Sequence, residues 1–363
     1  MYISSLSLSN FRNYSAEKIE FSPYTNVIYG DNAQGKTNIL EAVYIFSQGR
    51  SHRAKSDREL IKFGEDFAKL SLEFHDNERD YKSSVRLIKN GKKNIKINHV
   101  QITKLSMLMN YLNVVMFSPE DLDLVKGSPS ARRRFIDSSI SQLYPRYLTS
   151  LIDYHKALDQ KNSLLKTLKF KGVKSDVMLS VWNEQLAIEA SKIMKYRTDF
   201  TALIDEFAAK IQKEISGETL KIAYSPGIKT EDIDKSTIFK YLERNQRREI
   251  ELASAQVGVQ RDDLHISING NEAKVYGSQG QQRTAALSMK IAQADYIHHV
   301  KGEYPVLLLD DIMSELDINR RMYLSEKITG KQVLITSTDT DLIESTDNTQ
   351  LLHIKNGSVI REE

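Results

Sequence analysis

The sequence contains no cysteine, which excludes disulfide bonds and thiolate metal sites and favours a reducing compartment. No stretch approaches the ~20 apolar residues of a membrane span. The first residues also lack the basic and then apolar pattern of a secretion signal. We therefore expect a cytoplasmic protein with no membrane attachment. The net charge is only +3, so any basic surface must come from local clustering.

The eight histidines show no spacing that is typical of metal ligands. The chain has 363 residues, which is more than one compact core usually holds, so two lobes are expected. Apolar residues make up 40% and charged residues 27%, as in a globular protein.

The most informative segment present is residues 30–37, which read G-D-N-A-Q-G-K-T. An apolar run that predicts a strand precedes it, and an amphipathic run that predicts a helix follows it. This context identifies a phosphate-binding loop. Gly30 and Gly35 let consecutive backbone amides point at anionic oxygens. Lys36 supplies a charge for the β- and γ-phosphates, and the Thr37 hydroxyl can ligate magnesium.

Two further segments complete a nucleotide site. The all-apolar run at 306–309 ends in Asp310 and Asp311. Such runs belong in parallel sheets covered on both faces, where Asp310 could hold magnesium and Asp311 could polarise an attacking water. A serine turn at 278–281 also joins strand to helix and offers a second anion site. Both sites could serve one molecule, or each nucleotide could lie between the loop of one copy and the serine turn of another.

The two ends of the chain read as sheet and the middle as helix. Period-two alternation and Asn-Gly turns predict hairpins at 85–97, 264–276 and 352–360. Two long helices, around 147–168 and 181–211, are expected to pack as an antiparallel hairpin. The predicted fold is therefore α/β, with a head formed by residues 1–118 and 255–363. A helical lobe, residues 119–254, is inserted between them.

The helical region carries three basic clusters: Arg132 to Arg134, the lysines between 156 and 174, and the arginines at 244–248. A single run of this kind is more often a solvated helix face. Three of them beside a nucleotide-binding head favour a polyanion. No aromatic-interleaved motif marks base stacking, so we predict contacts with the phosphate backbone.

These motifs resemble the RecF family of bacterial recombination mediators, which carry an SMC-like ATP-binding-cassette head. The resemblance covers essentially the whole chain. Besides the phosphate loop, it is carried by residues 8–14, 117–122, 126–135, 157–162, 261–264, 276–286 and 309–317.

The resemblance implies roles for individual residues. The catalytic group comprises Lys36, Asp310, Asp311 and Ser278, and Mg²⁺ is held by Thr37 and Asp310. The ATP contacts are Arg12, Asn13, Gly30, Asn32, Ala33, Gln34, Gly35, Lys36, Thr37, Asn38, Ser278, Gly280, Gln281 and Asp317. The DNA-binding candidates are Arg132, Arg133, Arg134 and Lys161.

Four departures from related proteins stand out. Residues 118–120 occupy the Q-loop position without a glutamine, and Thr338 stands where transporter ATPases have a switch histidine. With Asp311 in the place of a glutamate, these features predict slow turnover. Residues 258–260 read G-V-Q where the family usually reads G-P-H, and we place no site there.

The function implied is ATP-dependent head-to-head dimerisation that clamps duplex DNA near single-strand gaps and at junctions. Weak, DNA-stimulated hydrolysis of ATP would then reopen the clamp. The implied partners are RecO, RecR and, indirectly, RecA. The alternative is a metabolic or transport-type ATPase without a DNA role. A purely architectural SMC protein would need a far longer coiled coil.

Overall fold

The computed structural model describes residues 1–173, 175–338 and 348–360. The chain folds into two compact units. The first comprises residues 1–121 and 287–363, and the second comprises residues 122–286. Lys174 and residues 339–347 and 361–363 lie outside the description.

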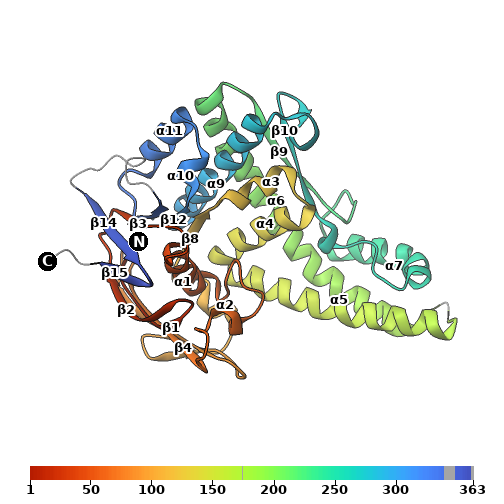
Figure 1. Ribbon diagram of the computed structural model, residues 1–363. Helices are drawn as coiled ribbons and strands as arrows, with labels where there is room; N and C mark the ends of the chain where they lie inside the picture. The colour runs from red at the N-terminus through yellow and green to blue at the C-terminus, as the bar shows by residue number, and fades with distance from the viewer. Residues whose placement is uncertain (174, 339–347, 361–363) are drawn as a thin grey trace. The chain divides into compact units, whose positions relative to one another are not determined.

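The first unit contains two six-stranded sheets (Figure 1). One is antiparallel, with spatial order β2 (Tyr14–Glu20), β1 (Tyr2–Phe11), β4 (Phe67–His75), β5 (Asp80–Ile88), β6 (Asn94–Ile97) and β7 (Val100–Ile102). Alternate residues of β4 and β5 are buried, as expected for strands with one face on a core. The hairpin predicted around Asn90-Gly91 is confirmed as β5–β6.

The other sheet is parallel except at one edge. Its spatial order is β15 (Ser358–Ile360), β14 (Thr349–Lys355), β3 (Thr25–Tyr29), β13 (Val333–Ser337), β12 (Val306–Asp310) and β8 (Val114–Phe117). The apolar runs of β12 and β13 are buried along their lengths. Because β3 lies between two strands from the C-terminal part of the chain, this sheet cannot form without that part.

Helix α1 (Lys36–Gln48) packs between the two sheets, since one core cluster joins its apolar residues to those of both. The remaining helices of the unit are shorter: η1 (Asp57–Leu60), α2 (Leu105–Leu108), η2 (Pro119–Leu122), α10 (Ile312–Glu315) and α11 (Ile318–Ile328).

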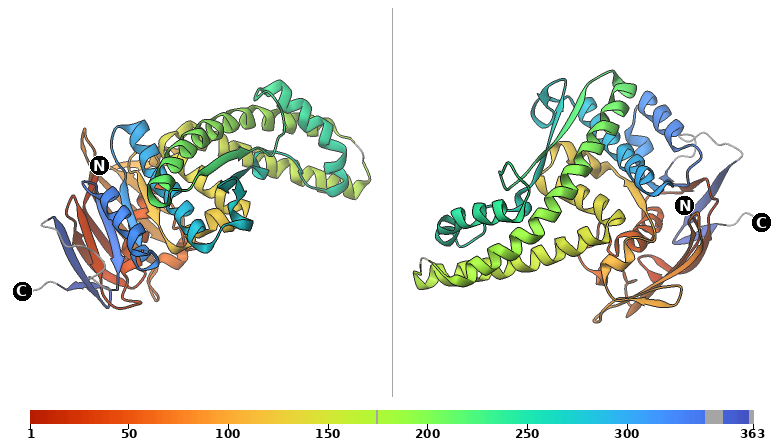
Figure 2. Two further views of the ribbon diagram at one scale, coloured as in Figure 1. Left: turned by 90° about the horizontal axis from the view of Figure 1, so that it is seen from above. Right: turned by 180° about the vertical axis from the view of Figure 1, so that it is seen from behind.

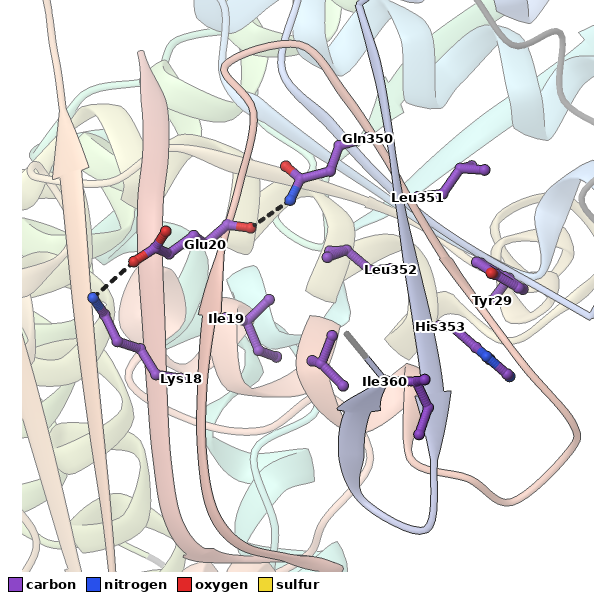
Figure 3. Close-up of a pocket in the computed structure, with 10 residues that line it drawn as sticks. Lys18, Ile19, Glu20, Tyr29, Gln350, Leu351, Leu352, His353 and Ile360 are labelled. Atoms are coloured by element: carbon purple, nitrogen blue, oxygen red, sulfur yellow. Dashed lines mark hydrogen bonds and ion pairs between the residues drawn. The ribbon is translucent and has the colours of Figure 1, made fainter. Parts of the chain in front are cut away.

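A pocket of about 420 Å³ opens where the edge strand β2 of the first sheet meets β14 and β15 of the second. Figure 3 shows Gln350, whose amide donates to the carbonyl of Glu20 (3.0 Å), and Lys18, which pairs with the Glu20 carboxylate (2.9 Å). The Gln350 hydrogen bond joins the two sheet edges, whereas the Lys18–Glu20 pair lies within β2. None of the residues that line the pocket is among the predicted site residues.

The second unit is mainly helical, and its two longest helices are α5 (Pro145–Lys171) and α6 (Val177–Ser216), which run along each other (Figure 2). This confirms the predicted helical hairpin. The other helices are α3 (Asp123–Lys126), α4 (Pro129–Leu143), α7 (Lys235–Leu252), η3 (Val259–Arg261) and α8 (Ala273–Tyr276). Helix α9 (Gln279–Lys301) begins in this unit and ends in the first.

A small antiparallel sheet in the second unit has the order β11 (Asn271–Glu272), β10 (Asp263–Ile268) and β9 (Leu220–Ser225). Its β10 pairs along its whole length with β9, a strand that the sequence did not distinguish from the surrounding helices. Residues 255–286 therefore cluster with the helical unit, whereas the sequence placed them in the head. The hairpin predicted at 264–276 is wrong at its end, because residues 273–276 form α8.

The centre of this unit is a buried polar network around Arg197, which is 1% exposed. Its guanidinium donates to Asp262 (2.5 Å), to Asp137 (2.8 Å) and to the carbonyl of Val259 (2.8 Å). The G-V-Q segment therefore belongs to this network. Gly258 has φ +138°, and an added Cβ would lie 2.2 Å from the Tyr154 hydroxyl, so only glycine fits.

Candidate nucleotide-binding site

The phosphate loop joins β3 to α1, as the sequence predicts. Gly30 has φ +144°, and a Cβ there would lie 2.3 Å from the carbonyl oxygen of Ile354. Gly35 has φ +114°, and a Cβ would lie 2.7 Å from the side-chain amide of Asn13. Both positions therefore require glycine for conformation and for space.

Residues far from the loop in sequence hold its backbone in place. The Asn13 amide donates to the carbonyl of Gln34 (2.8 Å), and the Asn38 amide donates to Asn13 (2.9 Å). Two backbone amides of the C-terminal hairpin also bind Gln34. The Asn356 N–H donates to the Gln34 side chain (2.5 Å), and the Gly357 N–H donates to the Gln34 backbone carbonyl (3.1 Å). Three predicted ATP contacts, Asn13, Gln34 and Asn38, thus shape the loop itself.

Lys36 folds back over the loop. Its ammonium donates to the carbonyls of Gly30 (2.7 Å) and Asp31 (2.9 Å), and the residue is 5% exposed. Asn32 and Ala33 lie at the exposed crest of the loop, and Ala33 is left-handed with φ +64°. The lysine is therefore already placed above the loop in which phosphates would lie.

Three oxygens converge beside Lys36. Asp310 Oδ1, at the end of β12, accepts hydrogen bonds from the hydroxyls of Thr37 (2.8 Å) and Thr336 (2.8 Å). Thr336 comes from β13, the strand between the loop strand and the Asp310 strand. The sequence predicted Thr37 with Asp310 but missed Thr336, because nothing in a buried apolar strand marks one threonine.

A hydroxyl and a carboxylate are hard oxygen ligands, which suits Mg²⁺. Among the described residues there is no cluster of three or more acids and histidines that could hold a metal by itself. Mg²⁺ commonly uses one or two protein groups, with phosphate oxygens and waters for the rest. Thr37 and Asp310 therefore fit a magnesium ion that arrives with a triphosphate.

Asp311 follows at the turn after β12, in a left-handed conformation with φ +50°. Its backbone amide donates to the Thr336 hydroxyl (3.0 Å). Burial and the neighbouring charge of Asp310 raise the pKa of Asp311, and Lys36 opposes this. A carboxylate with a raised pKa is a better proton acceptor, as a base acting on a water requires.

Arg12 holds the flank of the site through Glu41, which is fully buried on α1. The guanidinium forms two hydrogen bonds to this carboxylate (2.8 and 2.7 Å), and it donates to the carbonyl of Glu59 (3.0 Å). Burial raises the pKa of Glu41, but hydrogen bonds from Arg12 and Ser51 outweigh it, so the pKa lies below its usual value. The arginine that the resemblance assigns to ATP thus neutralises a buried acid in this structure.

Replacing Arg12 with glutamine is expected to destabilise the nucleotide-free protein by about 3 kcal/mol at neutral pH, because the buried Glu41 carboxylate then keeps only Ser51 and the more distant Arg53, at 3.8 Å. In the wild type, the depressed pKa of Glu41 contributes stability above about pH 4.3, which is lost as the pH falls further. In the variant, burial raises the pKa of Glu41, so acidification protonates this carboxyl group. The difference in the free energy of unfolding between the wild type and the variant then becomes smaller. Thermal unfolding of both proteins at pH 7 and pH 4.5 measures this narrowing.

The control for this experiment is Arg58→Gln, which changes an exposed arginine of the same region. It should unfold like the wild type. Equal stability of the Arg12 and Arg58 variants at neutral pH would show that the buried pair contributes nothing.

The polar loop after α1, which the sequence left open between a solvated loop and a nucleotide neighbour, bends back onto that helix. Ser51 donates to Glu41 (2.5 Å), and Arg53 donates to Asn38 (3.1 Å). His52 packs edge-on against Tyr44, and its Nδ1 is buried without a hydrogen-bond partner among the described residues. The loop therefore flanks the first turns of the phosphate-binding helix.

The serine turn belongs to the second unit, at the start of α9. Ser278 is exposed and forms a reciprocal cap with Gln281. The Gln281 amide donates to the Ser278 hydroxyl (3.2 Å), and Ser278 donates from its backbone to the Gln281 side chain (2.8 Å). Gly280 lies between them. The predicted nucleotide residues are therefore divided between the two units, Lys36 in one and Ser278 in the other.

Asp317 caps α11 by accepting a hydrogen bond from the backbone of Arg320 (3.0 Å). At the Q-loop position, the backbone of Ser118 donates to Asp121 (2.8 Å), which also pairs with the buried Lys290 at 3.6 Å. Thr338 is exposed directly after β13. The roles assigned to these residues by resemblance stay predictions.

The predicted DNA-binding residues are placed very differently from one another. Arg132 is 6% exposed and forms a two-bond ion pair with Asp263 (2.6 and 2.9 Å). Lys161 is fully buried and pairs with Glu249 at 2.6 Å. Arg133 donates to the backbone of Asp262 (2.8 Å), and Arg134 is exposed. Arg132 and Lys161 thus lack the exposure that binding to a phosphate needs, and neither is a candidate for contact with DNA.

The fold and the converging Lys36, Thr37 and Asp310 define a P-loop protein of the SMC class. The family model described as the RecF/RecN/SMC N terminal domain matches residues 2–360. A solved Smc head bound to the C-winged helix domain of ScpA shares the fold (TM-score 0.57, 15% identity, 99% of this chain and 96% of that one).

Two groups of relatives narrow the class. The DNA replication and repair protein RecF of Clostridium perfringens is 42% identical and that of Bacillus cereus is 41% identical. Each alignment covers 99% of this chain and at least 98% of the relative. A structure of the recombination mediator protein RecF-ATP in the RecFOR pathway matches with TM-score 0.93 at 35% identity, over 100% of this chain and 98% of that one. The RecF-ATPrS structure gives 0.92 and 36%, over 99% and 97%. The chain belongs to the RecF family.

Among the described helices, none combines the length and the apolar character that crossing a bilayer would require.

Proposed function

We propose that this chain is an ATP-dependent DNA-binding protein of recombinational repair. ATP joins two copies, and the joined pair clamps duplex DNA near single-strand gaps. The observation that carries the ATP part is the convergence of Thr37 and Thr336 on Asp310, together with the Lys36 ammonium held over the phosphate loop. Family membership and the relatives solved with ATP support the same reading.

The residues of the chain divide the work as follows. The loop amides and Lys36 bind the β- and γ-phosphates, while Thr37 and Asp310 orient magnesium. Bound Mg²⁺ would neutralise charge on the phosphates. Asp311 orients a water and takes up its proton. With a single carboxylate as base and no histidine at Thr338, turnover is slow and hydrolysis serves as the release step.

The second copy completes the site. Ser278 is exposed at the positive end of α9, where its hydroxyl and the helix dipole suit an anion. In our proposal, this end covers the triphosphate bound by the other copy. ATP then stabilises the dimer by linkage, because only the dimer makes both sets of contacts. Cooperation with RecO and RecR in loading RecA is part of the same proposal, on the strength of the relatives' pathway.

Sedimentation or size-exclusion measurements test the proposal. The wild type should be monomeric without nucleotide and dimeric with ATP and Mg²⁺. Lys36→Met should stay monomeric at every ATP concentration, because it lacks the charge that holds the phosphates. An ATP-independent oligomeric state in the wild type, or a normal dimer formed by Lys36→Met, would contradict it.

A further inference from the structure

Two basic segments that are far apart in sequence come together at one end of the second unit. The C-terminal part of α5 and the C-terminal half of α7 share an apolar cluster, in which Leu165 and Leu168 pack with Leu179 and Ile250. The ion pair between Lys161 and Glu249 joins the same two helices at 2.6 Å, with both side chains fully buried. Figures 1 and 2 show α7 lying beside the end of α5.

The cations of these two segments point to solvent. All six are exposed, and we call them the α5–α7 basic surface: Lys166, Lys169, Lys171, Arg244, Arg247 and Arg248. On α5, two of them are three residues apart, and on α7 the spacing is three and four residues. Residues at such spacings lie on one face of a helix. Each helix therefore presents a row of positive charge.

These cations are not balanced by acids. Among the residues that the structure describes, no carboxylate forms an ion pair with any of the six. Elsewhere on the same unit, exposed lysines do have partners: Lys156 pairs with Asp153, Lys192 with Glu189, and Lys235 with Glu184. Exposed lysines without an ion pair in the described part of the chain also occur on α6, at positions 195, 210 and 213, but these are spread along one helix. The α5–α7 basic surface differs because it brings six such cations together from two helices.

We propose that the α5–α7 basic surface binds the phosphate backbone of duplex DNA. This proposal rests on the proposed function. The α5–α7 basic surface takes the place of the buried Arg132 and Lys161 as the group that contacts DNA. Six exposed cations, none of which forms an ion pair among the described residues, suit phosphates, and contacts with the phosphate backbone carry no base code. Lys161 then has a structural role: its ion pair with Glu249 holds α7 on α5 and so keeps the two rows of charge together.

Apolar side chains accompany the charge. Phe170 is 93% exposed next to Lys169, and Leu252 is 49% exposed at the end of α7. An acidic protein partner could also use such a mixture of charge and apolar surface. We favour DNA because the charge is of one sign and is spread over two helices, and the experiment below separates the two.

The test uses the full-length protein and two triple variants, Lys166→Glu/Lys169→Glu/Lys171→Glu and Arg244→Glu/Arg247→Glu/Arg248→Glu. The control reverses three exposed lysines of α6: Lys195→Glu/Lys210→Glu/Lys213→Glu. All three proteins change their net charge by the same amount, so a general loss of attraction affects them equally. Glutamate and lysine have similar helix propensities, so folding should be retained. Because Lys171 lies at the end of α5, a Lys→Gln triple at 166, 169 and 171 checks for effects on the helix end.

Fluorescence anisotropy with two 30-base-pair duplexes of unrelated sequence, between 50 and 200 mM salt, measures binding. We expect each triple variant to bind at least about tenfold more weakly to both duplexes, with a salt slope that is smaller by about 0.9 for each phosphate that the protein no longer neutralises. The α6 control should keep the wild-type slope. Wild-type binding by both triple variants, or an equal weakening in the control, would overturn the proposal.

Dimerisation by ATP is recorded for the same variants. It should be unchanged, because none of the six cations belongs to the nucleotide site. If the variants dimerise with ATP and bind DNA normally, this inference fails while the proposed function stands. If the wild type neither dimerises nor binds DNA, the proposed function itself fails.

Discussion

Replacing Asp311 with asparagine is expected to lower ATP hydrolysis by about 10²- to 10⁴-fold while leaving ATP binding intact, since it removes the general base and keeps the phosphate contacts. The exchange is well suited to this position, because asparagine, like aspartate, accepts the left-handed conformation with φ +50°. The backbone hydrogen bond to Thr336 is retained as well. Any decrease in rate would then report on the carboxylate alone.

The variant should also prolong the dimer. If hydrolysis is the release step, Asp311→Asn should remain dimeric for hours after mixing with ATP, when the wild type has returned to monomers. Time-resolved light scattering after the addition of ATP measures this directly. The control is Thr338→Ala at the exposed position after β13, which should turn over ATP like the wild type. Unimpaired hydrolysis by Asp311→Asn would assign the base to another group.

Ser278→Arg should bind ATP as a monomer and fail to dimerise. A long, charged side chain at the start of α9 would be buried against the other copy without a partner, which costs several kcal/mol. A loss of about 2.7 kcal/mol already weakens self-association 100-fold. Nucleotide binding by fluorescence and mass by sedimentation, recorded on one sample, separate the two functions.

Two controls distinguish this effect from damage to the helix. Ser278→Ala removes the hydrogen bond to the Gln281 amide, which should cost about 1 kcal/mol of stability and weaken the dimer only in part. Ser163→Arg introduces the same side chain at an exposed position of α5 and should dimerise normally. If Ser278→Arg dimerises with ATP as well as the wild type does, Ser278 does not cover the nucleotide of the other copy.

The predicted nucleotide site depends mainly on local patterns. The glycines, Lys36 and Thr37 lie within eight residues, and their spacing follows from the backbone geometry of the loop. Asp310 was predictable because an all-apolar strand that ends in an acid has few places in a parallel sheet. Thr336 was not predictable, since its role depends on Asp310 and Thr37, which come from other parts of the chain.

The basic clusters show the opposite limit. Arg132 and Lys161 resemble surface cations in sequence, but their partners Asp263 and Glu249 lie 131 and 88 residues further along. Nothing local reveals that these charges are neutralised. The boundary of the second unit differs from the expected one for the same reason: β9 pairs with β10 across some 40 residues, and that pairing places residues 255–286 with the helical unit.

The contacts of Gln34 with Asn356 and Gly357 bear on how the protein is made. The phosphate loop is among the first parts to leave the ribosome, but both neighbours of its strand, β13 and β14, and the hairpin that anchors the loop are among the last. A nascent chain therefore has no formed pocket for ATP until synthesis is nearly finished. Only completed molecules can therefore bind the nucleotide. Truncated products lack the pocket and cannot form the ATP-dependent dimer.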